Sequence, residues 1–159
     1  MSRRYWLFKS EPDVYGYDDL AAMPDATDHW DGVRNYQARN LMRDEMSVGD
    51  LGIFYHSNTK PPHAAGILEI VREAYPDHTS WDEQAKYYDP KSSPEKPRWM
   101  MVDVKAVRPL ERPVSLAEMK ADPALAEMRL VQRGNRLSVF EIEAHEFEHV
   151  LHLASSPAP

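Results

Sequence analysis

The chain has 159 residues, of which 42% are hydrophobic and 28% charged, so it is long enough for one soluble domain with its own core. It contains no cysteine, which excludes disulfide bonds, thiolate metal sites and a cysteine nucleophile. The net charge of −7 argues against avid, nonspecific binding to duplex DNA, because such binding depends on many phosphate contacts with a basic surface.

The N-terminal half reads as short strands and helices. Residues 1–6 lack the apolar stretch and cleavage site of a signal peptide, so we expect a cytoplasmic protein. Alternating side chains predict a strand over Arg4–Lys9 that stops before Pro12, because proline cannot donate to a strand ladder. The next expected elements are a helix over 17–23, a polar loop over 25–32, a helix from Asn35 to Met46, a turn over 47–50, a strand over 51–56 and a loop over 57–62.

The C-terminal half continues the mixed pattern. We expect a strand over 64–74, an ordered loop over 77–97 with one helical turn at 81–86, a strand over 99–108, short helices from Ser115 and from Asp122, a strand over 137–140 and a helix over 144–153. A long loop in a compact domain is more often functional than incidental. Nowhere does an apolar run approach the roughly 18 residues of a membrane span.

These elements predict an α+β fold without regular βαβ units. Five to six strands with short helices packed outside are typical of a small mixed β-barrel, closed or nearly closed. We expect one domain over residues 1–154, a disordered tail over 155–159, and a monomer.

The segment from Trp30 to Asn40, WDGVRNYQARN, carries the strongest functional signal. It joins an indole, a phenol, two guanidiniums and three side-chain amides around a turn at Gly32 and a helix cap at Asn35. A segment with only a structural role would use aliphatic residues at these positions. Flat aromatic rings beside hydrogen-bond donors are suited to binding a planar, polar group such as a nucleobase.

This segment resembles the signature of the EVE domain, a PUA-like fold found in bacteria and in the thymocyte nuclear protein family. Further motifs in the same order strengthen the resemblance, which covers most of residues 4–150: YWLFKSEP at 5–12, GD at 49–50, FYHSN at 54–58, YYDPKS at 87–92, PRW at 97–99 and RLSV at 136–139. The resemblance implies a PUA-like architecture.

The YTH domains, which are distant PUA-like relatives, hold a methylated adenine in an aromatic cage. Their first strand ends in Lys-Ser before the pocket, as Lys9-Ser10 does here, and a cage tryptophan follows the first helix, as Trp30 does here. The similarity implies that Trp30 is a cage wall and that Glu11 contacts the edge of the base. Trp81, Tyr88 and Trp99 are our further candidates for cage walls.

The candidate ligand-binding residues combine aromatic rings with polar groups. They are Lys9, Ser10, Glu11, Trp30, Gly32, Val33, Asn35, Tyr36, Arg39, Tyr55, His56, Ser57, Asn58, Trp81, Tyr88 and Trp99. Backbone N–H groups near Gly32 could serve ring acceptors of a base. Each aromatic residue could instead belong to the core; for Trp30, flanked by Asp28-His29 and Asp31-Gly32, we favour the pocket. Basic residues expected to form a rim are Lys9, Arg34, Arg39, Arg43 and Lys60.

Two catalytic alternatives are weaker. His145-Glu146-Phe147-Glu148-His149 matches the H-E-x-x-H pattern of zinc hydrolases, but the chain leaves little room for a downstream third ligand, so a surface helix is the better explanation. Adjacent residues of a strand point to opposite faces, so neither Lys9-Ser10 nor His56-Ser57 is set up for proton transfer. We therefore expect no catalytic residue, metal or cofactor.

The sequence thus favours a non-enzymatic module that holds a base, in particular a modified one, of DNA or RNA in an aromatic pocket. The alternative is a sensor of a free nucleoside or another small polar ligand. An acidic face at 141–148 would repel phosphate, so we expect nucleic acid to approach from the side of Trp30–Arg43. We also expect Trp30→Ala to abolish binding and to leave the fold intact.

Overall fold

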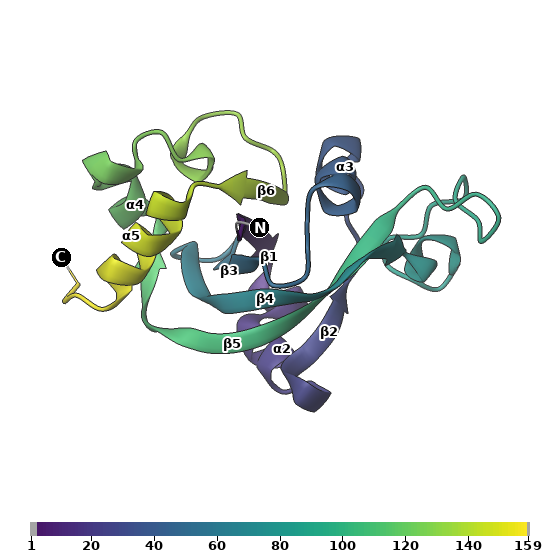
Figure 1. Cartoon of the computed structure of the whole chain (residues 1–159), viewed down its shortest axis with the longest axis horizontal. Helices are drawn as coiled ribbons and strands as arrows, with labels where there is room; N and C mark the ends of the chain where they lie inside the picture. The colour runs from purple at the N-terminus through teal and green to yellow at the C-terminus, as the bar shows by residue number, and fades with distance from the viewer. Residues whose placement is uncertain (1–2, 159) are drawn as a thin grey trace.

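The computed structural model describes residues 3–158 and contains one six-stranded sheet (Figure 1). The strands are β1 (Tyr5–Ser10), β2 (Thr27–Trp30), β3 (Leu51–His56), β4 (His63–Pro76), β5 (Met100–Ser115) and β6 (Val139–Ile142), in the order β2-β5-β4-β3-β1-β6. β1 pairs with β3 in parallel, and every other neighbouring pair is antiparallel. The segment judged not to be a signal peptide begins with residues 1–2, which lie outside the described part, as does residue 159 of the tail.

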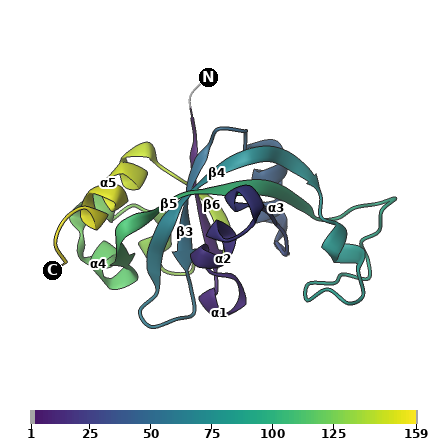
Figure 2. The same cartoon turned by 90° about the horizontal axis from the view of Figure 1, so that it is seen from below.

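Short helices connect these strands. They are α1 (Pro12–Tyr15), α2 (Tyr17–Ala21), α3 (Tyr36–Asp44), α4 (Leu116–Ala121) and α5 (Ala144–Ala154), with 3-10 turns η1 (Pro24–Ala26), η2 (His78–Trp81), η3 (Pro123–Leu125) and η4 (Arg129–Val131). Figures 1 and 2 show α4 and α5 together at one end of the molecule. At the other end lies the long connection between β4 and β5, residues 77–99, which we call the excursion. None of the helices formed by residues 3–158 has both the length and the apolarity needed to cross a membrane.

The predicted α+β class with five to six strands is confirmed, but the expected closure of a barrel is wrong. β2 and β6 lie at the two ends of the strand order and do not pair with one another, so the sheet is open. The sequence places β2 in a polar loop, because three of its four residues are polar. In the structure only its last residue, Trp30, is buried. β2 lacks an alternating sequence pattern and forms a strand through its pairing with β5, from Thr27 opposite Lys105 to Trp30 opposite Val102.

The segment after α5 has fixed partners. The hydroxyls of Ser155 and Ser156 donate to the carbonyl of His152, and Arg112 donates from Nε to the Ser156 carbonyl at 2.7 Å. Residues 155–156, which the sequence places in a disordered tail, therefore contact the end of α5 and the strand β5. The domain limits themselves stay a prediction.

The core is built around β1, which has a strand on each side. Trp6, Leu7 and Phe8 are fully buried there. Helix α2 is fixed against β4 by Tyr17, whose hydroxyl donates to the Ile67 carbonyl at 2.8 Å. A Cβ on Gly66 would lie 2.4 Å from the Tyr17 ring, so the close approach of α2 requires glycine at this position. Burial raises the pKa of Tyr17 to about 12, so the phenol stays a neutral donor.

The buried carboxylate of Asp50 joins three segments of this half of the molecule. It accepts the indole Nε1–H of Trp6 at 2.9 Å, the backbone N–H of Arg4 at 3.1 Å and the backbone N–H of Ser47 at 3.0 Å. These bonds fix the start of β1 against the turn that leads into β3. They therefore set the register of the parallel pair β1–β3.

We predict that Asp50→Ala lowers the free energy of unfolding by about 3 kcal/mol, because it leaves a buried indole N–H and two backbone N–H groups without acceptors. Urea unfolding followed by tryptophan fluorescence measures this change. Asp44→Ala is the matched control, because Asp44 is exposed and pairs only with its neighbour Arg43. Equal stability of the two variants would contradict the role given to Asp50.

Candidate functional site

Four segments that are distant in sequence meet at one edge of the sheet. Because β1 and β3 are parallel, their C-terminal ends lie together, and β6, which is antiparallel to β1, begins at the same edge. The N–H of Lys9 donates to the carbonyl of Ser138 at 2.8 Å, and the N–H of Ser57 donates to the carbonyl of Ser10 at 3.0 Å. Residues 9–11, 57 and 136–138 are thereby placed side by side, next to the end of β2.

A cavity of about 460 Å³ lies at this edge. Its volume is within the range of small-molecule sites. The cavity brings together seven of the residues that the sequence selects: Lys9, Ser10, Glu11, Trp30, Gly32, Val33 and Ser57. The remaining lining residues were not selected: Val14 and Tyr15 from α1, Asp28, His29 and Asp31 around the end of β2, Thr79, Ala85, Lys86 and Tyr87 from the excursion, and Arg136, Leu137 and Ser138 before β6.

Trp30 belongs to this cavity and also to the core. Only 8% of its surface is exposed, and its ring packs edge-on against Phe8 at 5.0 Å and Phe54 at 5.3 Å between centroids. The residues adjacent to Trp30 in sequence are polar or glycine, but its ring is packed by apolar residues of β1 and β3 that are distant in sequence. Truncating a buried aromatic side chain costs about 3–5 kcal/mol, so Trp30→Ala would also weaken the fold.

Tyr87 forms a second aromatic wall, and its position depends on Gly32. Gly32 has a φ of 81°, and a Cβ there would lie 2.6 Å from the Tyr87 ring. The phenol therefore packs directly on the glycine, while 40% of its surface remains exposed. Two requirements, a left-handed backbone and a close aromatic contact, make glycine necessary at this position.

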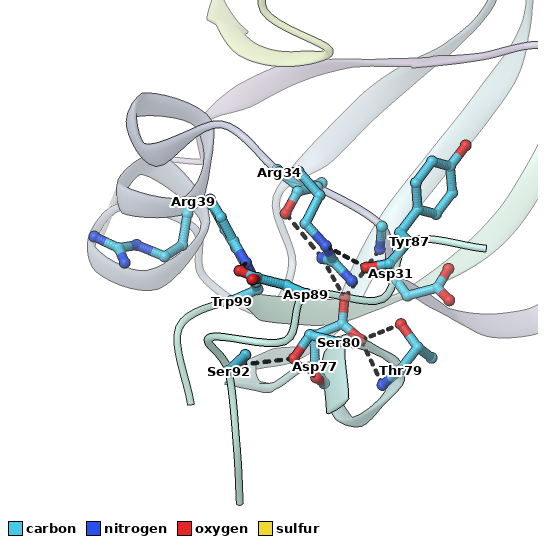
Figure 3. A network of polar contacts seen from close by, with 12 residues as sticks. Asp31, Arg34, Arg39, Asp77, Thr79, Ser80, Tyr87, Asp89, Ser92 and Trp99 are labelled. Atoms are coloured by element: carbon cyan, nitrogen blue, oxygen red, sulfur yellow. Dashed lines mark hydrogen bonds and ion pairs between the residues drawn. The ribbon is translucent and has the colours of Figure 1, made fainter. Parts of the chain in front are cut away.

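The carboxylate of Asp77 holds this wall in place (Figure 3). Asp77 is fully buried and accepts the Gly32 N–H at 3.0 Å, Arg34 Nη1 at 2.9 Å, and the N–H and hydroxyl of Thr79 at 2.9 and 2.6 Å. Arg34 in turn donates from Nε to the carbonyl of Tyr87 at 2.8 Å. The N–H of Gly32, expected to serve a base, is therefore already bonded to Asp77.

Burial alone would raise the pKa of Asp77. The hydrogen bonds from Thr79, from the Gly32 N–H and from Arg34 together outweigh that effect, and they hold the pKa below its ordinary value of 3.8. The carboxylate is therefore ionised at neutral pH, and its charge is matched by the Arg34 guanidinium.

Lys9 brings an unpaired cation to the cavity. Burial lowers the pKa of its ammonium group, whose nearest aromatic neighbour is Phe140, with Nζ 5.7 Å from the ring centroid. Within residues 3–158 no carboxylate lies within ion-pair distance of Nζ. A half-buried charge without a partner is unfavourable, so the ammonium group of Lys9 would gain from an acceptor placed in the cavity.

Other polar groups of the cavity have partners of their own. The Tyr15 hydroxyl donates to Asp28 at 2.7 Å, and burial together with this bond raises the pKa of Tyr15. Glu11 accepts from the Asn58 amide at 2.8 Å but keeps an exposed side. Within residues 3–158, the one ion-pair contact of Asp31 is with His29, at 3.9 Å. Glu11 and Asp31 are thus the carboxylates most available to a ligand.

Nine of the selected residues lie outside the cavity: Asn35, Tyr36, Arg39, Tyr55, His56, Asn58, Trp81, Tyr88 and Trp99. Three of them form a separate stack, in which the rings of Tyr36 and Trp99 lie 4.8 Å apart and the Arg39 guanidinium lies 4.7 Å from the Tyr36 ring. Tyr55 is buried in the core, and Asn35 caps α3 by accepting the Ala38 N–H.

The His145–His149 motif is part of α5 and has other partners there. Glu146, expected on a solvated acidic face, is buried, and its carboxylate accepts the Glu143 N–H at 2.8 Å in a capping box. His149 Nε2 lies 2.7 Å from Asp122, a contact that lowers the pKa of this carboxylate. In the part of the chain that the structure describes, no three His, Asp or Glu side chains are grouped so that they could hold a metal ion.

Comparisons with known proteins identify the family. The model described as the EVE domain matches residues 4–153, so the chain belongs to the EVE domain family. It is 47% identical to "Thymocyte nuclear protein 1" of Danio rerio, over 93% of this chain and 71% of that protein. The crystal structure of the human THYN1 protein in complex with 5-methylcytosine-containing DNA is 42% identical, with a TM-score of 0.91 over 98% of this chain and 99% of that chain.

The YTH resemblance is confirmed at the level of the fold. The YTH domain of Zygosaccharomyces rouxii MRB1, solved in complex with N6-methyladenosine RNA, has a TM-score of 0.57 and covers 99% of this chain and 87% of that chain. Its sequence identity of 15% leaves the roles of individual residues to be argued from this structure.

We predict that Gly32→Ala destabilises the protein more than Gly49→Ala does. Both positions have a positive φ, at 81° and 98°, but a Cβ on Gly49 meets nothing within 4 Å whereas one on Gly32 meets the Tyr87 ring. Backbone strain alone costs about 1 kcal/mol in each variant, and the clash adds to it only at Gly32. Thermal unfolding of the two variants measures the difference. Equal melting temperatures would show that Tyr87 does not rest on Gly32.

We predict that Asp77→Asn lowers the free energy of unfolding at pH 7 by about 3 kcal/mol, because it leaves the Arg34 charge without its buried partner. Since the folded pKa of Asp77 lies below the unfolded one, its contribution is complete above the unfolded pKa and is lost as the pH falls through the folded pKa. The difference in the free energy of unfolding between native protein and variant should therefore become smaller below about pH 4. Urea titrations at several pH values measure it, and a constant difference would refute the argument.

Proposed function

We propose that this protein is a non-enzymatic module that takes one modified base of a nucleic acid into the cavity beside Trp30, with 5-methylcytosine in DNA as the first ligand to test. The observation that carries the proposal is a cavity that combines two aromatic side chains with the unpaired ammonium of Lys9. The human relative seen with 5-methylcytosine-containing DNA supports the choice of ligand.

The two aromatic walls suit the faces of a base. Trp30 is held rigidly by Phe8 and Phe54, whereas Tyr87 lies on the excursion between β4 and β5 and stays exposed. Extruding a base from a helix costs a few kcal/mol, and stacking on one aromatic side chain returns about 1–3 kcal/mol. A methyl group on the base adds apolar area, worth about 0.8 kcal/mol when it is fully buried.

The polar groups of the cavity suit the edge of cytosine. The exocyclic amine of cytosine is a donor, and the exposed carboxylates of Glu11 and Asp31 are acceptors that a ligand could reach. The ring nitrogen and carbonyl of cytosine are acceptors, and Lys9 supplies donors without a competing carboxylate. Lys9, rather than the backbone N–H of Gly32, is therefore the proposed donor to the acceptor atoms of the base.

The serine and histidine residues near the cavity support binding rather than catalysis. The hydroxyl of Ser10 donates to the carbonyl of Tyr15 at 2.6 Å, which ties it to α1. His56 accepts the backbone N–H of Tyr17 at Nε2, and its Nδ1 lies 3.1 Å from His63. Both imidazole nitrogens are therefore engaged away from Ser57, so this pair is not arranged for nucleophilic attack.

A free nucleoside is the second candidate ligand. The carboxylates of Glu11, Asp28 and Asp31 line the cavity, and the chain carries a net charge of −7, so part of its surface repels a polymer of phosphates. A sensor of this kind would bind the nucleoside as tightly as the oligonucleotide. A module that reads nucleic acid gains affinity from the flanking phosphates.

We predict that Tyr87→Ala weakens binding of a 5-methylcytosine oligonucleotide by roughly 5- to 150-fold, the value of one stacking contact. Tyr88→Ala is the matched control, because Tyr88 is the adjacent residue with a similar exposure of 38% and lies outside the cavity. Fluorescence polarisation with labelled oligonucleotides that carry cytosine or 5-methylcytosine measures both variants, with 5-methyldeoxycytidine as a competitor.

Three results would redirect the proposal. Equal losses in the two tyrosine variants would remove the cavity from base recognition. Equal affinity for cytosine and 5-methylcytosine would exclude the modification as the determinant, and other modified bases in DNA and RNA would follow. Competition by the free nucleoside at the same concentration as the oligonucleotide would favour the sensor.

A further inference from the structure

A second hollow of about 380 Å³ adjoins the base cavity. One side of this hollow is formed by η4 and the segment 132–137, which arches toward α3 before β6 begins (Figure 1). The other side is formed by the residues at the start of α3. Arg136 and Leu137 line both hollows, so the two are neighbours. The second one is polar, and none of its lining residues is acidic.

Three arginines line this hollow: Arg129, Arg133 and Arg136. Among residues 3–158 their guanidiniums have no carboxylate within ion-pair distance and no hydrogen-bond partner in the protein. All three side chains are exposed. Unpaired arginines gathered around a polar hollow form a local positive surface on a chain of net charge −7.

The arginines that the sequence assigned to a basic rim are engaged elsewhere. Arg34 is bound to the buried carboxylate of Asp77, and Arg43 forms a bidentate pair with Asp44. Arg39 donates to the carbonyl of Arg98 at 2.9 Å and to the Asn40 amide. The charges of Arg34 and Arg43 are already paired with carboxylates, so they contribute less to binding a phosphate than the unpaired arginines of residues 129–136.

Asn135 adds an independent indication of a ligand. Its Oδ1 accepts the N–H of Leu137 at 3.2 Å, which fixes the orientation of the amide. Its Nδ2 is buried and has no partner in the protein, and the residue lines the hollow. A buried donor without an acceptor is costly, so a ligand oxygen that reaches Nδ2 after a small shift of the lining side chains would gain a hydrogen bond there.

We propose that this hollow holds the phosphodiester backbone next to the base that enters the first cavity. The inference rests on the function proposed above and adds a separate site to it. Guanidinium groups match phosphate oxygens in geometry and charge, and the Asn135 amide supplies one more donor. Arg136 lines both hollows, so its guanidinium is the one assigned to the phosphate of the extruded nucleotide.

The test is the salt dependence of binding. Arg129→Gln and Arg133→Gln, singly and together, remove charges that have no partner in the fold, so each variant should fold normally. Each lost phosphate contact lowers the slope of log affinity against log salt concentration by about 1. We expect the double variant to lose about two from this slope while keeping the affinity ratio between 5-methylcytosine and cytosine oligonucleotides.

Two controls make the result specific. Arg43→Gln removes a charge that is already paired with Asp44, so its salt slope should equal that of the native protein. Asn135→Asp keeps the acceptor for the Leu137 N–H but places a negative charge in the hollow, so it should weaken binding of every oligonucleotide. Inorganic phosphate as a competitor separates a polymer site from a site for any small anion.

The outcomes separate this proposal from the function proposed above. A native salt slope in the double variant, with modification-dependent binding intact, overturns the backbone site alone. A reduced slope in the double variant with an unmodified oligonucleotide, together with equal affinity for cytosine and 5-methylcytosine, supports the backbone site and excludes 5-methylcytosine as the recognised base. The backbone site is overturned if inorganic phosphate competes at the same concentration as the oligonucleotide. It is also overturned if the native protein binds no oligonucleotide.

Discussion

The candidate site depends on the buried carboxylate of Asp77. This group lies where β4 ends and the long excursion begins, and it bonds at once to Gly32 after β2, to Arg34 before α3 and to Thr79 in η2. Two further bonds tie the excursion to the segment after β2, from Arg34 to the Tyr87 carbonyl and from Arg39 to the Arg98 carbonyl. Loss of the Asp77 carboxylate would release Gly32 and Thr79 from one another and so loosen the wall formed by Tyr87.

The charge distribution reconciles an acidic protein with an anionic ligand. Carboxylates dominate the whole chain, but several are bound to arginines that form part of the fold, such as Arg4 with Glu141 and Arg112 with Glu118. Among the described cations without an ion pair, Lys9 lines one hollow and the arginines of residues 129–136 line the other, near the edge of the sheet where the strands β1 and β3 end. Attraction is thus local and directional, which favours one docking orientation over nonspecific contact.

The sequence predicted those parts of the fold whose signals are local. The strands β1, β3, β4 and β5 lie where the sequence places them, and the helix caps Asn35 and Ser115 accept the bonds expected of them. The open sheet could not be read in this way, because β2 is short and polar and becomes a strand only through pairing with β5. Of the candidate site, residues 9–11, Trp30, Gly32, Val33 and Ser57 line one cavity, and the roles that the family resemblance implies for Trp30 and Glu11 stay predictions.

Tyr87 shows why the rest was missed. Nothing in its neighbourhood distinguishes it from Tyr88, and the contacts that select it are long-range: the ring rests on Gly32, and the backbone carbonyl accepts from Arg34. The hydrogen bond from Arg34 holds the loop through the backbone of Tyr87 and does not involve its side chain. Evolution or protein engineering can therefore exchange the aromatic group at position 87, and with it the shape offered to a base, without rebuilding the support beneath it. In this protein the choice of ligand and the stability of the scaffold are separately adjustable.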